Sequence, residues 1–361
     1  SLQELALVVW AFQSQLEQLE NLEISRRIRS WRGLYSESIM LGWRIAEELR
    51  RRMQLRESPP RDVKAMLRQL RSLGVLDAKT LSKAVSELGE LAELQEAQEA
   101  VPGPRAASQA FTTENQAKDQ PRIVIDLLEE AVIYKPRGWE VTPTAGSSHH
   151  QLSDFVRQTM PAHSISFDPT SSHGFLHRLD VVTSGLVLKA KNYRAYHNLD
   201  LQLLQGSIDR EYQVLCHGHW RRVSGCLDLP IFALKGAETQ QSKVSTPGAR
   251  PAQSEVTALS RLSFGSRALS LLLVRIKTGR RHQIRAQTAH VGHPVVSDGF
   301  YATQSTFSED QKWCGDCFLH RHRLAFTDMS GVRREALMPL PSSLSAALKL
   351  AASQRAWAQK E

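Results

Sequence analysis

The sequence predicts an α+β domain preceded by an all-α N-terminal domain, and two observations support this fold class. Over residues 1–100 the apolar residues recur at helical spacing, whereas after residue 121 they form short runs bounded by Gly and Pro. Residues 101–121 are rich in Pro, Gly, Ser, Thr, Asn and Gln and hold almost no aliphatic residues. We therefore expect a helical accessory domain over 1–100, a flexible linker over 101–121 and a folded domain over 122–361.

The N-terminal region contains a predicted helical hairpin. Its two helices cover Asp62–Leu73 and Thr80–Leu88, with Gly74 placed to end the first and Asp77 to cap the second. Successive helical pairs of about 35–40 residues are typical of a solenoid. The segment Glu4–Phe12 is similar to the first helix of octotricopeptide-type organellar RNA-binding repeats. A solenoid-like array is therefore the expected form of this region.

Beyond the linker, short apolar runs predict strands. Four runs rich in β-branched and aliphatic residues are bounded by polar or turn-forming residues. They are Ala131–Tyr134, Gly185–Ala190, Tyr212–His217 and Leu269–Ile276. One predicted helix, near His282–His290, interrupts them. This mixture indicates an α+β domain.

The composition excludes two classes of protein. No apolar run approaches the ~18 residues needed to cross a bilayer, so we expect neither a spanning helix nor a membrane partner. Four cysteines in 361 residues are too few for a disulfide scaffold and favour a soluble protein of a reducing compartment. A hydrophobic content of 41% is enough for a sizeable core.

The net charge of +9 is confined to one part of the chain. Residues 1–100 hold 15 Lys and Arg against 15 Asp and Glu, and the rest of the chain holds 31 against 22. A local basic excess suggests a polyanionic partner, most often nucleic acid. Charge that serves only solubility is the alternative, and composition does not separate the two.

Three clusters of charged and small residues stand out in the second domain. The first is His177–Asp180 (HRLD), followed by Thr183–Gly185 (TSG) and an apolar run. The second, Lys277–Arg285 (KTGRRHQIR), leads to Gly292–Pro294 (GHP), and the third, Arg210–Tyr212 (REY), opens a predicted strand. Charged residues at the start of a strand tend to be paired or functional. Taken singly, each residue also fits a structural role, such as a turn aspartate or a core tyrosine.

Together these clusters resemble the RluA-type pseudouridine synthases. Members of that family carry the HRLD and Thr-Ser-Gly motif, a Thr-Gly-Arg-Thr-His-Gln-Ile-Arg motif and a His-Pro loop followed by Gly-Asp. Further landmarks match Lys135–Gly138 (KPRG), Leu319-His320 and Pro339–Pro341 (PLP), in the family's order over about 220 residues. The resemblance implies a mixed, largely antiparallel sheet flanked by helices.

The resemblance also implies roles for individual residues. Asp180 matches the catalytic aspartate, which attacks the target uridine at either the sugar C1′ or the base C6. Tyr212 matches the tyrosine that stacks on the flipped uracil, and Arg285 the basic residue paired with the aspartate. RNA contacts or support of the active site are expected of Lys135, Arg178, Thr183, Arg280, Arg281, His282 and Gln283. The reaction is an isomerisation of uridine in rRNA or tRNA, so we expect no metal and no cofactor.

The sequence departs from the family pattern at three positions. Arg281 replaces the usual Thr, Gln287 the usual His, and Ser297 the Gly that normally precedes Asp298. None of these changes removes a proposed catalytic group. The RNA-binding module that often precedes this domain in the family is not recognisable, so target selection is expected to differ.

A group of cysteine and histidine residues lies near the end of the second domain. Cys314 and Cys317, followed by His320 and His322, are residue types that bind zinc, but their spacing is compressed. We therefore expect two reduced thiols in a surface loop.

A non-catalytic RNA-binding or ribosome-assembly component that keeps the synthase fold is the alternative function. The N-terminal helices then suggest docking to a ribonucleoprotein, and an organelle such as the mitochondrion is favoured over the cytoplasm.

Overall fold

The structure is a computed structural model. It describes residues 119–143, 148–233, 241–245 and 247–358, excepting the side chains of 353–358, and scattered residues between 44 and 92. By their contacts the residues form two compact units, 1–101 with 193–207, and 102–192 with 208–361. The predicted helix Glu4–Phe12, the turn residues Gly74 and Asp77, and residues 101–118 of the predicted linker lie outside the described residues.

In the first unit, every described residue between 44 and 92 is helical. Met66 and Leu88, both apolar positions of the predicted hairpin, are fully buried. Helix α6 (Tyr193–Gln205) belongs to the same unit, and its Asp200 lies 3.2 Å from the ammonium of Lys64. The solenoid stays a prediction.

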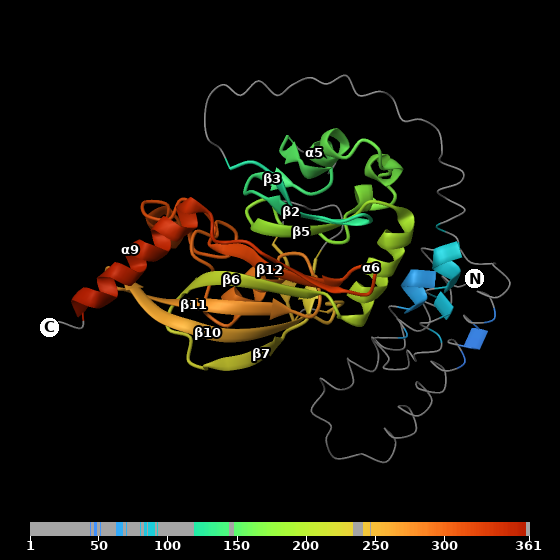
Figure 1. Ribbon diagram of the computed structural model, residues 1–361. Helices are drawn as coiled ribbons and strands as arrows, with labels where there is room; N and C mark the ends of the chain where they lie inside the picture. Colours follow the sequence, from blue (N-terminus) through green and yellow to red (C-terminus); the bar gives the residue numbers. More distant parts are fainter. Residues whose placement is uncertain are drawn as a thin grey trace, which may run out of the picture. The chain divides into compact units, whose positions relative to one another are not determined.

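A nine-stranded sheet forms the centre of the second unit (Figure 1). Its order is β1-β2-β5-β12-β6-β11-β10-β7, and β13 pairs with β12 outside this path. All pairings are antiparallel except that of β5 with β12, so the sheet is mixed and largely antiparallel, as predicted. The strands are β1 (Arg122–Asp126), β2 (Glu130–Lys135), β5 (Ser184–Ala190), β6 (Asp209–His217), β7 (Ser224–Asp228), β10 (Gln253–Phe264), β11 (Arg267–Ile276), β12 (Leu319–Thr327) and β13 (Arg333–Leu337).

Short elements complete the second unit. Strands β3 (Trp139–Glu140) and β4 (His150–Gln151) pair with each other, as do β8 (Ile231–Phe232) and β9 (Lys243–Val244). The helices are α5 (Leu152–Thr159), η1 (Ser164–Phe167), η2 (Ser172–Gly174), α7 (Gln283–His290), α8 (Gln304–Asp310) and α9 (Ser342–Ala358). Within the described ranges, none of the helices combines the length and hydropathy that crossing a bilayer requires.

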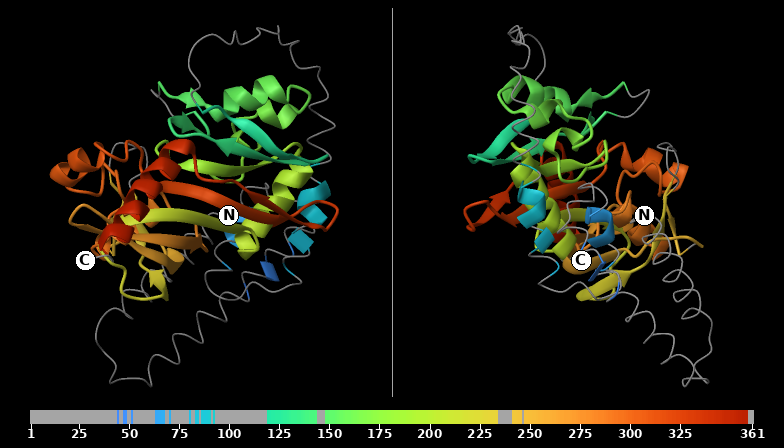
Figure 2. Two further views of the ribbon diagram at one scale, coloured as in Figure 1. Left: turned by 60° about the vertical axis from the view of Figure 1, so that its left-hand side comes forward. Right: turned by 90° about the vertical axis from the view of Figure 1, so that its right-hand side faces the viewer.

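The alternation of side chains along β6 divides the core into two layers. Tyr212, Val214 and Cys216 join a cluster that includes Ile284 of α7, whereas Leu215 joins a cluster with α9. Successive side chains of a strand point to opposite faces of the sheet. Helix α9 therefore covers one face (Figure 2), and Tyr212 faces the layer that contains α7.

The four predicted strands and the predicted helix are confirmed as β2, β5, β6, β11 and α7. The expectation of a single helix in this domain is wrong, because α5, α6, α8 and α9 also form. Strand β12 was not among the strands predicted from apolar runs, because its LHRHRL run carries two His and two Arg, and charged residues are uncommon in buried strands. The family resemblance implied only a small β segment after Leu319.

Candidate active site

Asp180 lies in the loop that leads into β5, and backbone contacts hold this loop from two sides. The Asp180 carbonyl accepts a hydrogen bond of 3.0 Å from the Thr183 amide, which closes a turn. The Gly138 amide donates to the Val181 carbonyl at 2.8 Å, and the φ of 82° at Gly138 favours glycine. The KPRG turn is thus the support on which the HRLD loop rests.

Lys135 supports that turn from inside the protein. Its ammonium is fully buried and donates to the carbonyls of Pro136 at 2.9 Å and Trp139 at 2.7 Å. Burial lowers the pKa of Lys135 to about 7, and the charge of Asp180 opposes this effect only in part. Lys135 is thus placed to support the KPRG turn, and its role in the site stays a prediction.

Helix α7 carries Arg285, and the residues before α7 form a sharp turn. His282 has a φ of 55°, in the left-handed region, so the chain turns sharply into the helix. The Gln283 side chain accepts from the Thr278 hydroxyl at 2.8 Å and the Arg280 amide at 3.0 Å, and donates to Ser254. Gln283 is thus a structural support of the KTGRRHQIR loop.

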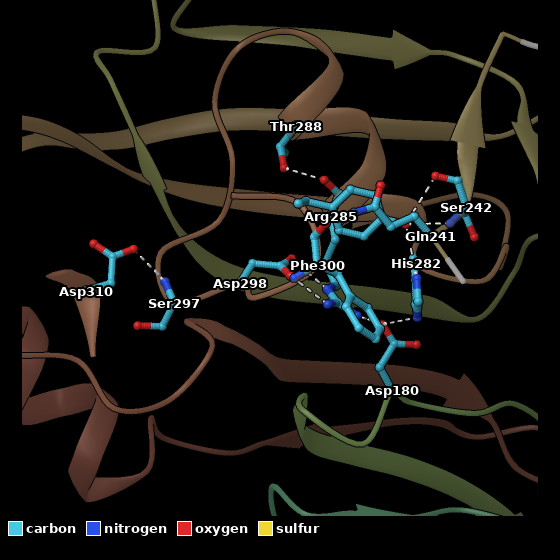
Figure 3. A network of polar contacts seen from close by, with 11 residues as sticks. Asp180, Gln241, Ser242, His282, Arg285, Thr288, Ser297, Asp298, Phe300 and Asp310 are labelled. Carbon is cyan, nitrogen blue, oxygen red and sulfur yellow. Dashed lines mark hydrogen bonds and ion pairs between the residues drawn. The ribbon is translucent and has the colours of Figure 1, made fainter. Parts of the chain in front are cut away.

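Arg285 binds two carboxylates at once (Figure 3). Its Nη1 donates to Asp180 Oδ2 at 3.0 Å, while Nε and Nη2 both donate to the Asp298 carboxylate at 2.7 Å. Both Arg285 and Asp298 are almost completely buried. Burial acts against the charge, but the hydrogen bonds of Asp298 outweigh it and raise the pKa of Arg285 above its ordinary value.

These contacts keep Asp180 ionised. Burial alone would raise its pKa, but the charges of His282 (when protonated), Arg285 and Arg178 outweigh burial and hold the pKa below its ordinary value. Burial lowers the pKa of His282 to about 4, so this imidazole is neutral at pH 7. Its Nε2 lies 3.9 Å from Asp180 Oδ2. At neutral pH, Arg285 is therefore the main charge acting on Asp180.

The loop that carries Asp298 is held by a second buried carboxylate. Asp310 accepts from the Ser297 amide at 2.9 Å, bonds His217 Nε2 at 2.8 Å and pairs with Arg267 at 3.2 Å. Ser297 has a φ of 59°, a conformation that favours glycine, and its hydroxyl donates to the Cys314 carbonyl. The family's usual glycine at this position thus has a physical reason, and Ser297 offsets the strain with a hydrogen bond.

Tyr212 belongs to a second polar cluster, centred on Arg321 of β12. The Tyr212 hydroxyl accepts from both Nε (2.9 Å) and Nη2 of Arg321, and Nη1 donates to His177 Nδ1 at 2.8 Å and the Leu186 carbonyl at 3.0 Å. Burial and the charges of Arg321 and Arg210 lower the pKa of His177 well below its ordinary value, so its ring is a neutral acceptor. Among the described residues, Arg321 takes part in no ion pair with a carboxylate.

Gly185 allows this cluster to form. In the strand register Arg321 is opposite Gly185 of β5 on one side and Tyr212 of β6 on the other. A Cβ on Gly185 would lie 2.4 Å from the Arg321 carbonyl oxygen, and the φ of 130° disfavours any other residue. The glycine of the TSG motif is therefore needed for the close approach of β12.

The structure brings some of the predicted residues together and not others. Asp180, His282 and Arg285 form one cluster, and Tyr212 lies in the apolar layer that contains Leu179 and Ile284. The other predicted residues line the supporting loops: Thr183 closes the turn after Asp180, Arg178 is exposed, Arg280 Nε donates to the Pro251 carbonyl, and the Arg281 carbonyl accepts from Ser242.

Three residues were missed as functional supports. Asp298 was identified only as a landmark, and its position 13 residues after Arg285 does not reveal the bidentate pair. Arg321 and His177 meet across 144 residues, so only the strand order brings them together. The signal that could have found Arg321 is a charged residue directly after the Leu-His landmark.

The prediction that two cysteines lie in a surface loop is wrong. Cys314 and Cys317 are buried and not exposed in a surface loop. Burial raises the pKa of Cys314 to about 11, so the thiol is protonated at neutral pH. His320 contacts Ser184 through one ring nitrogen and the Met338 carbonyl through the other. Across the described residues, no group of three or more His, Cys, Asp or Glu side chains is arranged to hold a metal ion.

Gln287 has a structural role. It is fully buried, its amide donates to the carbonyls of Leu229 and Ala252, and its oxygen accepts from Ser254. This departure from the family pattern therefore concerns packing between α7 and β10, away from the Asp180–Arg285 pair.

Similarity to known proteins agrees with this geometry. Residues 130–290 match the model of a family described as RNA pseudouridylate synthase. The chain is 30% identical over 246 residues to the ribosomal large subunit pseudouridine synthase D of Escherichia coli O6:H1, which covers 64% of this chain and 72% of that protein. It is 34% identical over 182 residues to an uncharacterized RNA pseudouridine synthase of Mycobacterium bovis, covering 49% of this chain and 56% of that protein.

The chain spans only about half the length of the first relatives it matches. Among solved structures, human RNA pseudouridylate synthase domain containing 1 matches with a TM-score of 0.51 and 22% identity, over 65% of this chain and 90% of that one. This likeness supports the fold.

Proposed function

The chain belongs to the RNA pseudouridylate synthase family, and on that premise we propose that it isomerises uridine to pseudouridine in structured RNA. One observation supports this proposal above all others. The Asp180 carboxylate is kept ionised by a buried arginine, which a second buried carboxylate, Asp298, holds in place. A nucleophilic carboxylate needs this arrangement in a partly dry pocket.

The chemistry requires the uridine to leave its stack. Flipping costs a few kcal/mol, and stacking on an aromatic ring such as Tyr212 recovers about 1–3 kcal/mol per base. Asp180 then attacks C1′ or C6 and forms a covalent bond to it, and the bond between N1 and C1′ breaks. After the base turns, a bond between C5 and C1′ forms, and the bond to Asp180 breaks and returns the free carboxylate. N1 gains a proton and C5 loses one, so the atoms balance and no redox group is required.

The name of one relative suggests which class of RNA to test first. One relative is named as a ribosomal large subunit synthase, which makes rRNA the first RNA to test, with tRNA next. The basic excess of the chain after residue 100 supports a polyanionic substrate. A ribosomal or organellar partner for the N-terminal helices stays a prediction from the sequence.

Pseudouridine mapping tests the proposal. RNA incubated with the wild-type chain is compared with RNA incubated with Asp180→Asn, and exposed Asp228→Asn serves as the control with the same charge change. We expect sites that appear with wild type and Asp228→Asn and are lost with Asp180→Asn. Absence of any site, with RNA association preserved, would instead favour the non-catalytic assembly component.

A further inference from the structure

Phe300 places an exposed aromatic ring beside the Asp180–Arg285 pair. The residue is 39% exposed, and its ring centroid lies 5.4 Å from Cζ of Arg285. The ring of His282 lies 5.7 Å away at an interplanar angle of 44°. Figure 3 draws Phe300 in the same network of contacts as Arg285 and Asp298. An apolar ring is thus open to solvent at the most strongly charged part of the site.

The backbone of Phe300 is fixed on both sides. Its amide donates to Asp298 Oδ1 at 3.0 Å, and its carbonyl accepts from the Gln241 side chain. The hydroxyl of the next residue, Tyr301, accepts from the Ser242 amide at 2.7 Å. A ring held in this way loses little conformational freedom when a ligand packs on it.

The chemistry around the ring selects the ligand. A flat apolar face that is partly exposed suits a planar aromatic group. Exposed Arg178 lies in the same HRLD loop as Asp180 and adds a positive charge that suits an anion such as a phosphate. A nucleobase with its phosphate combines both properties, and every base has a face that stacks on an aromatic side chain.

We propose that Phe300 is a stacking platform for the nucleobase next to the uridine that enters the Asp180 site, an inference that rests on the proposed function. Tyr212 is only 4% exposed and lies within the core layer, so it suits the flipped uracil itself. Phe300 is at the surface and suits a base that remains outside. When a uridine flips, its neighbour loses a stacking partner, and the Phe300 ring replaces that partner.

A base-deletion experiment tests the platform. Fluorescence anisotropy measures binding of the full chain to a 12-nucleotide single-stranded RNA with one uridine, and to two RNAs that lack only the base 5′ or 3′ of it. We expect Phe300→Ala to weaken binding of the intact RNA about 10-fold and to have no effect on one of the two base-deleted RNAs. Phe300→Tyr should restore binding, whereas Phe300→Leu, which has no aromatic face, should not.

Phe167→Ala is the matched control, because Phe167 is also 39% exposed. It should leave all three affinities unchanged. Equal losses for all three RNAs, or no loss with Phe300→Ala, would overturn the platform, and the mapping with Asp180→Asn would still decide the proposed function. A chain that binds none of the three RNAs and forms no pseudouridine would refute both.

Discussion

Two buried arginines contact the segment that carries Asp180, and their charges are balanced in different ways. Arg285 lies between the carboxylates of Asp180 and Asp298. Arg321 instead contacts neutral groups: the Tyr212 phenol, the His177 imidazole and a backbone carbonyl. The first cluster controls the charge of Asp180, and the second controls the position of an aromatic ring. One short motif, HRLD, thus has an electrostatic contact at its aspartate and a positional contact at its histidine.

Removing Arg285 should have the largest effect. Arg285→Met leaves the buried Asp298 carboxylate without its partner, which we expect to lower the free energy of unfolding by about 3–5 kcal/mol. Urea unfolding measures the loss, with exposed Arg222→Met as the control. A loss no larger than that of the control would show that the two-carboxylate arrangement is not a stabilising element.

Removing Arg321 should cost less. Arg321→Met leaves only neutral groups without partners and removes a buried charge, so we expect a loss of about 1–2 kcal/mol in the same unfolding measurement. Because Arg321 acts on the Tyr212 hydroxyl, its effect should shrink by at least about 0.5 kcal/mol when Tyr212→Phe is already present. Equal losses for Arg285→Met and Arg321→Met would remove the distinction between the two clusters.

Lys135 responds to both clusters, since the charge of Asp180 raises its pKa and that of Arg321 lowers it. The unfolded chain keeps this proton up to pH of about 10.4, but the folded chain only up to about 7. Between these values the unfolded state holds more protons, so stability rises with pH.

Lys135→Met should therefore flatten the rise in stability. We expect its slope between pH 7 and 9 to fall below that of wild type by about 1 kcal/mol per pH unit, measured by urea unfolding. Lys349→Met, at an exposed position of α9, controls for loss of a lysine. Parallel slopes for wild type and Lys135→Met would contradict the low pKa of Lys135.

The smallest effect on stability is expected at Ser297, which directly precedes the Asp298 that pairs with Arg285. Ser297→Ala keeps a Cβ at a φ of 59° and loses the hydrogen bond to Cys314, whereas Ser297→Gly loses the hydrogen bond but relieves the backbone. We expect the glycine variant to be more stable than the alanine variant by about 1 kcal/mol in thermal unfolding. Equal stability would mean that the backbone at this position is not strained.

The two clusters also differ in how far the sequence predicts them. Asp180 and Arg285 were identified because each belongs to a contiguous motif whose pattern is visible along the chain. Asp298 was visible only as a landmark, because its pairing depends on the path of a loop. Arg321 escaped prediction because its role arises from strand order, which local patterns do not encode.

The strands and helices also differ in how far the sequence predicts them. Strands β2, β5, β6 and β11 were predicted because their apolar runs are continuous. Helix α9 was missed although Leu344, Ala347 and Ala351 recur at helical spacing on its buried face, so closer attention to small residues would have found it.

The position of β12 has a consequence for synthesis of the chain. This strand lies between β5 and β6, yet it begins only at Leu319. During translation β5 and β6 emerge long before the strand that separates them, and each presents an unpaired edge in the meantime. Arg321, the residue that joins His177 to Tyr212, arrives with that strand. The polar cluster of Arg321, Tyr212 and His177 is therefore completed late, after most of the domain has left the ribosome.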